Sequence, residues 1–87
     1  MRLRRQIALL VERAGEPRLA HWIEYEHGEG TRARVAVYDH APTLIPRGKV
    51  SLRLEAERYD VDPAAARRWL EGEGYRIRGE VEGAWSG

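Results

Sequence analysis

Apolar and polar residues alternate one by one in three segments, and this period of two constrains the fold more than any other feature. The segments are residues 32–38, 50–57 and 75–81. Successive side chains of a strand point to opposite faces, so each segment is predicted to be a half-buried strand. The residues assigned to the buried faces are Ala33, Val35, Val37, Val50, Leu52, Leu54, Ala56, Tyr75, Ile77 and Val81.

Residues 17–27 fit two structures. In a helix, Leu19, Trp22 and Ile23 would share one face. In a strand, Leu19, Ile23 and Tyr25 would share a face and Trp22 would lie on the opposite, exposed one. The strand is favoured, because the segment is rich in β-branched and aromatic residues and the Gly-Glu-Gly turn at 28–30 leads into the next strand.

Two segments are predicted to be helical. Residues 3–14 place Leu3, Ile7, Leu10 and Ala14 on one stripe of a 3.6-residue period, and the following glycine suits a helix end. A shorter helix is predicted to begin with Asp62 as N-cap and Pro63 in the first turn. It is expected to end at Gly72 or Gly74.

The predicted order of elements is therefore α-β-β-β-α-β. It indicates a small α+β fold, with helices packed on one face of a mainly antiparallel sheet. The 87 residues are too few for a second domain, so 1–87 is expected to be one domain. Residues 41–48, with two prolines and a glycine, are interpreted as a loop, and 83–87 as a frayed tail.

The amino-acid composition restricts the cellular location and the kinds of chemistry expected for this protein. The sequence has no run of apolar residues long enough for a membrane span and no apolar stretch of a signal peptide, so a cytoplasmic protein without membrane contact is expected. It has no cysteine, which excludes disulfides and thiolate chemistry. The histidines lack metal-ligand spacing and are interpreted as surface residues: His21, His27 and His40.

Catalytic motifs are also missing. No Gly-rich phosphate loop occurs, and none of the few hydroxyl residues stands in a nucleophile motif. We therefore expect a protein that is not an enzyme, with no catalytic residues, no metal and no small-molecule cofactor.

Spare aromatic and apolar residues favour a protein–protein interaction module. Tryptophan and arginine are enriched in protein interfaces, and an apolar loop tip between two prolines has the same character. A small core also gains stability from a partner or from a second copy of the chain. A self-associating accessory, regulatory or inhibitory protein is expected, and nothing in the residues separates a phage or mobile-element regulator from a housekeeping subunit. The predicted contacts are Trp22, Leu44, Ile45, Arg47 and Trp85.

Binding of nucleic acid is the alternative. Fourteen of the 15 basic residues are arginine, and an arginine-bearing sheet face can bind single-stranded nucleic acid. The candidate residues are Arg2, Arg4, Arg5, Arg32, Arg34 and Arg53. The same strands also carry glutamates, so cross-strand Arg–Glu pairs that neutralise the face are the simpler expectation.

Overall fold

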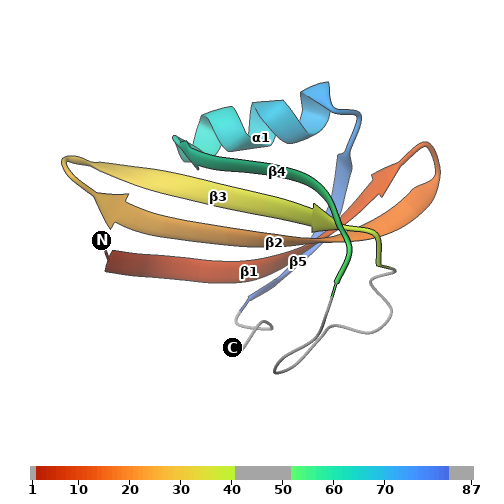
Figure 1. The fold of residues 1–87 in the computed structure, drawn as a ribbon, viewed down its shortest axis with the longest axis horizontal. Helices are drawn as coiled ribbons and strands as arrows, with labels where there is room; N and C mark the ends of the chain where they lie inside the picture. The colour runs from red at the N-terminus through yellow and green to blue at the C-terminus, as the bar shows by residue number, and fades with distance from the viewer. Residues whose placement is uncertain (1, 41–51, 83–87) are drawn as a thin grey trace.

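A computed structural model describes residues 2–40 and 52–82. The described chain forms an antiparallel sheet of five strands with one helix on it (Figure 1). The strands lie in the order β4-β3-β2-β1-β5, so the last strand in sequence pairs with the first. The elements are β1 (Arg2–Arg13), β2 (Glu16–His27), β3 (Gly30–Tyr38), β4 (Leu54–Val61), α1 (Pro63–Gly72) and β5 (Arg76–Glu82).

Two tight turns connect the three central strands. Between β1 and β2, Ala14 and Gly15 both have positive φ, at 51° and 80°, as a type I′ hairpin turn requires. Between β2 and β3, Gly28 has a φ of 65° at the first central position, as in a type II′ turn. Both turns match the right-handed twist of the strands that they connect.

The helix predicted over residues 3–14 is wrong, because this segment is strand β1. Ile7, Leu9 and Val11 are buried on the face that carries α1, and Ala8 is buried on the opposite face. With apolar residues on both faces, the period of two disappears, and the remaining spacing imitates a helical stripe. Gly15 accordingly forms the hairpin turn instead of ending a helix.

The other helices and strands largely agree with those predicted from the sequence. The strand interpretation of 17–27 is confirmed by β2, and the strands at 32–38 and 75–81 by β3 and β5, although Tyr75 precedes β5. The helix is also confirmed: the Asp62 carboxylate accepts a hydrogen bond from the Ala64 backbone N–H at 3.0 Å, and α1 ends at Gly72. One helix, not two, therefore covers the sheet in the part of the chain that the structure describes.

Strand β4 differs from its predicted form. The structure does not describe residues 50 and 51, and β4 begins only at Leu54 and extends to Val61. A register irregularity between Val37 and Tyr38 places Ala56 beside the core, whereas Leu54 lies opposite Tyr38 and is 50% exposed. Leu54 is thus not a core residue, because a bulge reverses the alternation that predicted one.

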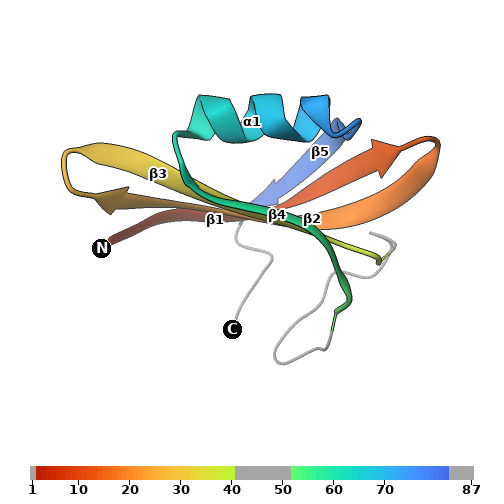
Figure 2. The same cartoon turned by 45° about the horizontal axis from the view of Figure 1, so that its top comes forward.

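The core lies between α1 and the sheet (Figure 2). Ala66 and Leu70 of the helix are fully buried against it. Trp22 is 1% exposed in this layer, so the prediction of an exposed Trp22 is wrong. The core residues from the strands and from the residue before β5 are Ile7, Leu9, Val11, Ala20, Trp22, Ala33, Val35, Val37 and Tyr75.

The loop predicted at 41–48 and the tail predicted at 83–87 lie outside the described residues. Within the described ranges, no helix has the length and apolar character needed to cross a membrane.

Candidate functional site

The sheet has one face covered by α1 and another, here called the outer face, on the opposite side. Cross-strand partners share a face, so the register assigns Ile23 with Arg34, Tyr25 with Arg32 and Tyr38 with Leu54 to the outer face. Glu57 and Tyr59 of β4 lie on the same side, because they line a depression together with Ile23 and Tyr25. The outer face therefore combines aromatic and aliphatic side chains with charged ones.

The depression is lined more by apolar than by polar surface. It is shallow, has a volume of about 500 Å³ and lies across β2, β3 and β4. Tyr59 at its rim is 65% exposed, and Leu54 further along β4 is 50% exposed. Leu3, which pairs with Tyr25 on the same face, is 59% exposed. These exposed side chains make the outer face a candidate contact surface.

Arginines of the outer face have acidic partners. Arg34 donates two hydrogen bonds to Glu57 Oε2, at 2.6 Å and 3.2 Å. Arg32 donates to Asp60 through Nε at 3.3 Å and also bonds the Asp60 backbone carbonyl. The Tyr25 hydroxyl donates to the same carboxylate at 3.4 Å. These two positive charges are thus balanced within the face.

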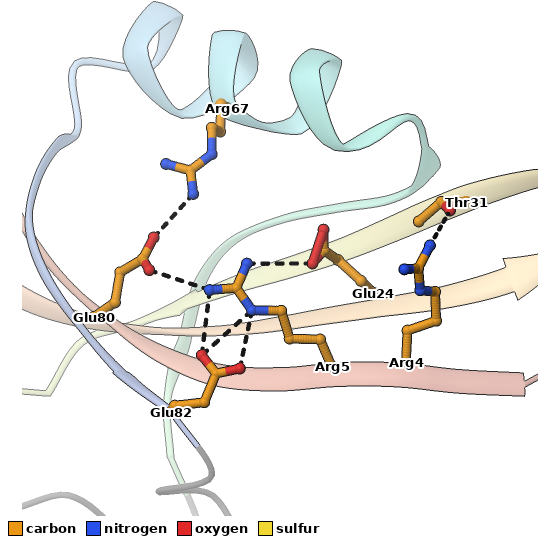
Figure 3. A network of polar contacts seen from close by, with 7 residues as sticks. All are labelled: Arg4, Arg5, Glu24, Thr31, Arg67, Glu80 and Glu82. Carbon is orange, nitrogen blue, oxygen red and sulfur yellow. Dashed lines mark hydrogen bonds and ion pairs between the residues drawn. The ribbon is translucent and has the colours of Figure 1, made fainter.

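Two of the N-terminal arginines predicted for nucleic acid lie in ion pairs elsewhere. Arg4 contacts Glu26 at 3.9 Å and donates to the Thr31 hydroxyl at 3.0 Å. Arg5 lies on the α1 side of β1 and contacts three glutamates, at 3.1 to 3.5 Å (Figure 3). The three are Glu24, Glu80 and Glu82, and hydrogen bonding to Glu82 is the main cause that raises the pKa of Arg5.

The remaining predicted site residues are not brought together. Arg2 and Arg53 are exposed and form no ion pair within residues 2–40 and 52–82. Trp22 is in the core and cannot be a contact residue, which corrects its predicted role. Leu44, Ile45, Arg47 and Trp85 lie outside the described residues.

A polar cluster, in which Tyr75 is buried and Glu55 and Arg18 are partly exposed, joins β2 and β4 to the residue before β5. The hydroxyl of Tyr75, which is 2% exposed, donates to Glu55 Oε2 at 2.5 Å, and Arg18 donates to Glu55 Oε1 at 3.1 Å. Burial raises the pKa of Tyr75 to about 12, and the hydrogen bond from Tyr75 is the main cause that lowers the pKa of Glu55. The guanidinium of Arg13 lies 4.7 Å from the Tyr75 ring centre. Each residue of this cluster contacts another residue of the cluster, so we interpret its role as structural.

His21 differs from the predicted surface histidine. It lies on the outer face and is partly buried. Burial, and to a lesser extent the positive charge of Arg34, lowers the pKa of His21 to about 4, so the imidazole is neutral at pH 7. In the part of the chain that the structure describes, no three His, Asp or Glu side chains are grouped to hold a metal ion.

Sequence reasoning did not single out Tyr25, Tyr59 or Asp60 as site residues. Tyr59 follows Glu57 at a spacing of two, which places both on one face of a strand. That alternation was the available signal, but the predicted strand ended at residue 57. Comparison with protein-family models, with curated proteins and with solved structures finds no match to this chain.

Proposed function

We propose that this protein is a small, non-enzymatic protein–protein interaction module that self-associates and binds a partner protein through its outer sheet face. The observation that carries the proposal is the combination of exposed apolar side chains with internally neutralised charge. Leu3, Leu54 and Tyr59 are each at least half exposed there, and the neighbouring arginines are paired with Glu57 and Asp60.

A neutral apolar surface fits a protein partner better than a polyanion. Binding of nucleic acid depends largely on unpaired positive charge that replaces counterions along the phosphates. Arg4, Arg5, Arg32 and Arg34 already have carboxylate partners in this structure. A phosphate would have to displace those carboxylates, whereas an apolar partner surface would cover Tyr59 and Leu54 and leave the ion pairs intact.

The test compares three purified proteins as baits in a nuclease-treated extract of the host cell. Wild type and Arg68→Glu should retain the same partner, and Tyr59→Ser should lose it. Arg68 is an exposed residue of α1 that forms no ion pair among the described residues, so its variant controls for a general change of surface. The partner is then purified and titrated by calorimetry against each bait, with at least tenfold weaker binding expected for Tyr59→Ser, about 1.4 kcal/mol.

Two results would overturn the outer face as the binding surface. One is a purified partner that binds wild type and Tyr59→Ser equally well. The other is tight binding of the wild type to labelled single-stranded DNA or RNA at low salt, weakening steeply as salt is added. That second result would instead support the nucleic-acid alternative.

A further inference from the structure

Strand β5 forms one edge of the sheet, and its sequence is complementary to itself. The sheet order leaves β5 paired with β1 on one side and with no described strand on the other. From Arg76 to Glu82 the strand reads Arg-Ile-Arg-Gly-Glu-Val-Glu, with two arginines before Gly79 and two glutamates after it. We infer that two copies of this chain pair antiparallel through β5, around a two-fold axis at Gly79.

The antiparallel arrangement brings opposite charges together. Around an axis at Gly79, Arg78 of each copy lies opposite Glu80 of the second copy. Arg76 pairs with Glu12 on the outer face, whereas Glu82 pairs with Ile7 on the α1 side, so Arg76 and Glu82 do not form a second pair. Ile77 and Val81 are likewise on different faces, because Ile77 pairs with Val11 and Val81 with Ala8. Opposite charges in cross-strand pairs stabilise a sheet, and like charges destabilise it. A shift of the register by two residues places like charges opposite each other, Glu80 with Glu80 or Arg78 with Arg78, so the charge pattern favours the axis at Gly79.

The charges needed for this contact are available on each copy. Arg76 and Arg78 are exposed and form no ion pair with any described residue. Beside them on the α1 side, Arg5 and Arg67 share the three carboxylates of Glu24, Glu80 and Glu82 (Figure 3). Two positive charges face three negative ones, which leaves a net charge of −1 in that group. Arg78 of the second copy would balance it.

An irregularity in β5 limits the length of the contact. Leu10 pairs with Gly79 but Val11 pairs with Ile77, so Arg78 is an extra residue in the ladder with β1. A bulge twists an edge strand and interrupts regular pairing. We therefore expect the pairing between the two copies to be limited to residues 78–80. The dimer should be weak, concentration-dependent and sensitive to salt.

This inference deepens the self-association in the proposed function and rests on it. A two-fold axis perpendicular to the sheet keeps the two α1 helices on the same side. The two outer faces then join into one larger surface, and the β5 contact does not cover Tyr59 or Leu54. Dimerisation and binding of a partner protein would therefore use separate parts of the molecule.

The first experiment measures molecular mass by sedimentation velocity over a wide range of protein and salt concentrations. Wild type should form a dimer that dissociates on dilution or at high salt. Arg78→Glu replaces both central Arg–Glu contacts by Glu–Glu contacts and should weaken the dimer roughly thirtyfold, about 2 kcal/mol. Arg68→Glu makes the same charge change on α1 and should dimerise like wild type.

A mixing experiment tests the pairing itself. Glu80→Arg should also be monomeric alone, because Arg78 would then face the new arginine of the second copy. Mixed with Arg78→Glu, it should form a heterodimer in which both central contacts are again between opposite charges. Circular dichroism checks that Glu80→Arg is folded, and if it is not, the comparison of Arg78→Glu with Arg68→Glu still decides the question.

A cysteine at the axis tests the register. The chain has no cysteine of its own, and a Cβ at Gly79 would make only an ordinary contact, 3.6 Å from Leu10 Cδ1. Gly79→Cys should therefore fold and form a disulfide-linked dimer on mild oxidation, since residue 79 faces itself across the axis. Arg68→Cys should form much less.

Three results would overturn the inference. They are a wild-type mass of one chain at all concentrations, a dimer that Arg78→Glu leaves unchanged, and a Gly79→Cys variant that cross-links no better than Arg68→Cys. A dimer abolished by Tyr59→Ser but not by Arg78→Glu would retain self-association and place it on the outer face. Loss of the partner protein with an intact dimer would contradict only the outer-face proposal.

Discussion

Removing the hydroxyl of Tyr75 should destabilise the protein measurably. Tyr75→Phe keeps the buried ring and its contact with Arg13 but removes the hydrogen bond to Glu55. A hydrogen bond to a charged group contributes about 1.5–3 kcal/mol. Glu55 retains Arg18 as a partner and some access to water, which favours the lower limit, about 1.5 kcal/mol. For a domain of this size that loss lowers the Tm by roughly 6–12 °C.

The assay is urea unfolding followed by tryptophan fluorescence, together with thermal melts. Tyr59→Phe is the matched control, because Tyr59 is exposed and its hydroxyl has no hydrogen-bond partner among the described residues. It should change the free energy of unfolding by less than about 0.5 kcal/mol. If Tyr75→Phe is as stable as this control, the hydrogen bond contributes nothing and our account of the cluster is incorrect.

The same variant should remove part of the alkaline pH dependence of stability. The pKa of Tyr75 is raised to about 12 in the folded protein, from about 10 in an unfolded chain. The stabilisation linked to Tyr75 is therefore fully present below pH 10 and is lost as the pH rises towards 12. Unfolding free energies measured at pH 9, 10 and 11 should fall more steeply for wild type than for Tyr75→Phe. Parallel slopes would contradict the assigned shift.

The effects of three further substitutions on stability are expected from burial, charge and backbone geometry. Leu70→Ala should lower the free energy of unfolding in urea by about 3 kcal/mol, because Leu70 is completely buried in the core. A decrease of less than about 1 kcal/mol would mean that α1 packs loosely on the sheet. His21 has a pKa of about 4, so wild-type stability should decrease as the pH falls from 6.5 to 4, and His21→Gln should show a smaller decrease over that range. Gly15→Ala should cost about 1 kcal/mol because of its positive φ, whereas Gly30→Ala, which also has open space but no positive φ, should cost clearly less.

Local signals in the sequence were sufficient for several elements. Asp62 and Pro63 indicate the start of α1 through the chemistry of an N-cap and a first turn. Strand β3 was predictable because Ala33, Val35 and Val37 all face the core. In each case neighbouring residues determine the conformation, so no information about distant pairing is needed.

Pairing between distant segments explains the errors. Strand β1 lies between β2 and β5, and burial on both of its faces removes the alternation that marks a strand. The irregular register beside Tyr38 exposes Leu54, and no residue type indicates it. The candidate surface was unpredictable for the same reason. Arg34 is bound to Glu57 because β3 and β4 are neighbours in the sheet. The sequence alone does not show which strands are neighbours, so it does not show whether Arg34 is free to bind a partner.

The pairing of β5 with β1 also determines the order of events during synthesis. Ile7 pairs with Glu82, so this ladder can close only when nearly the whole described chain has left the ribosome. Until then, β1 presents an unpaired apolar edge while the hairpins with β2 and β3 can already form. An exposed edge of this kind is a site of aggregation in a nascent chain. The interval before β5 is synthesised is therefore the period in which the unpaired edge of β1 is most exposed to aggregation.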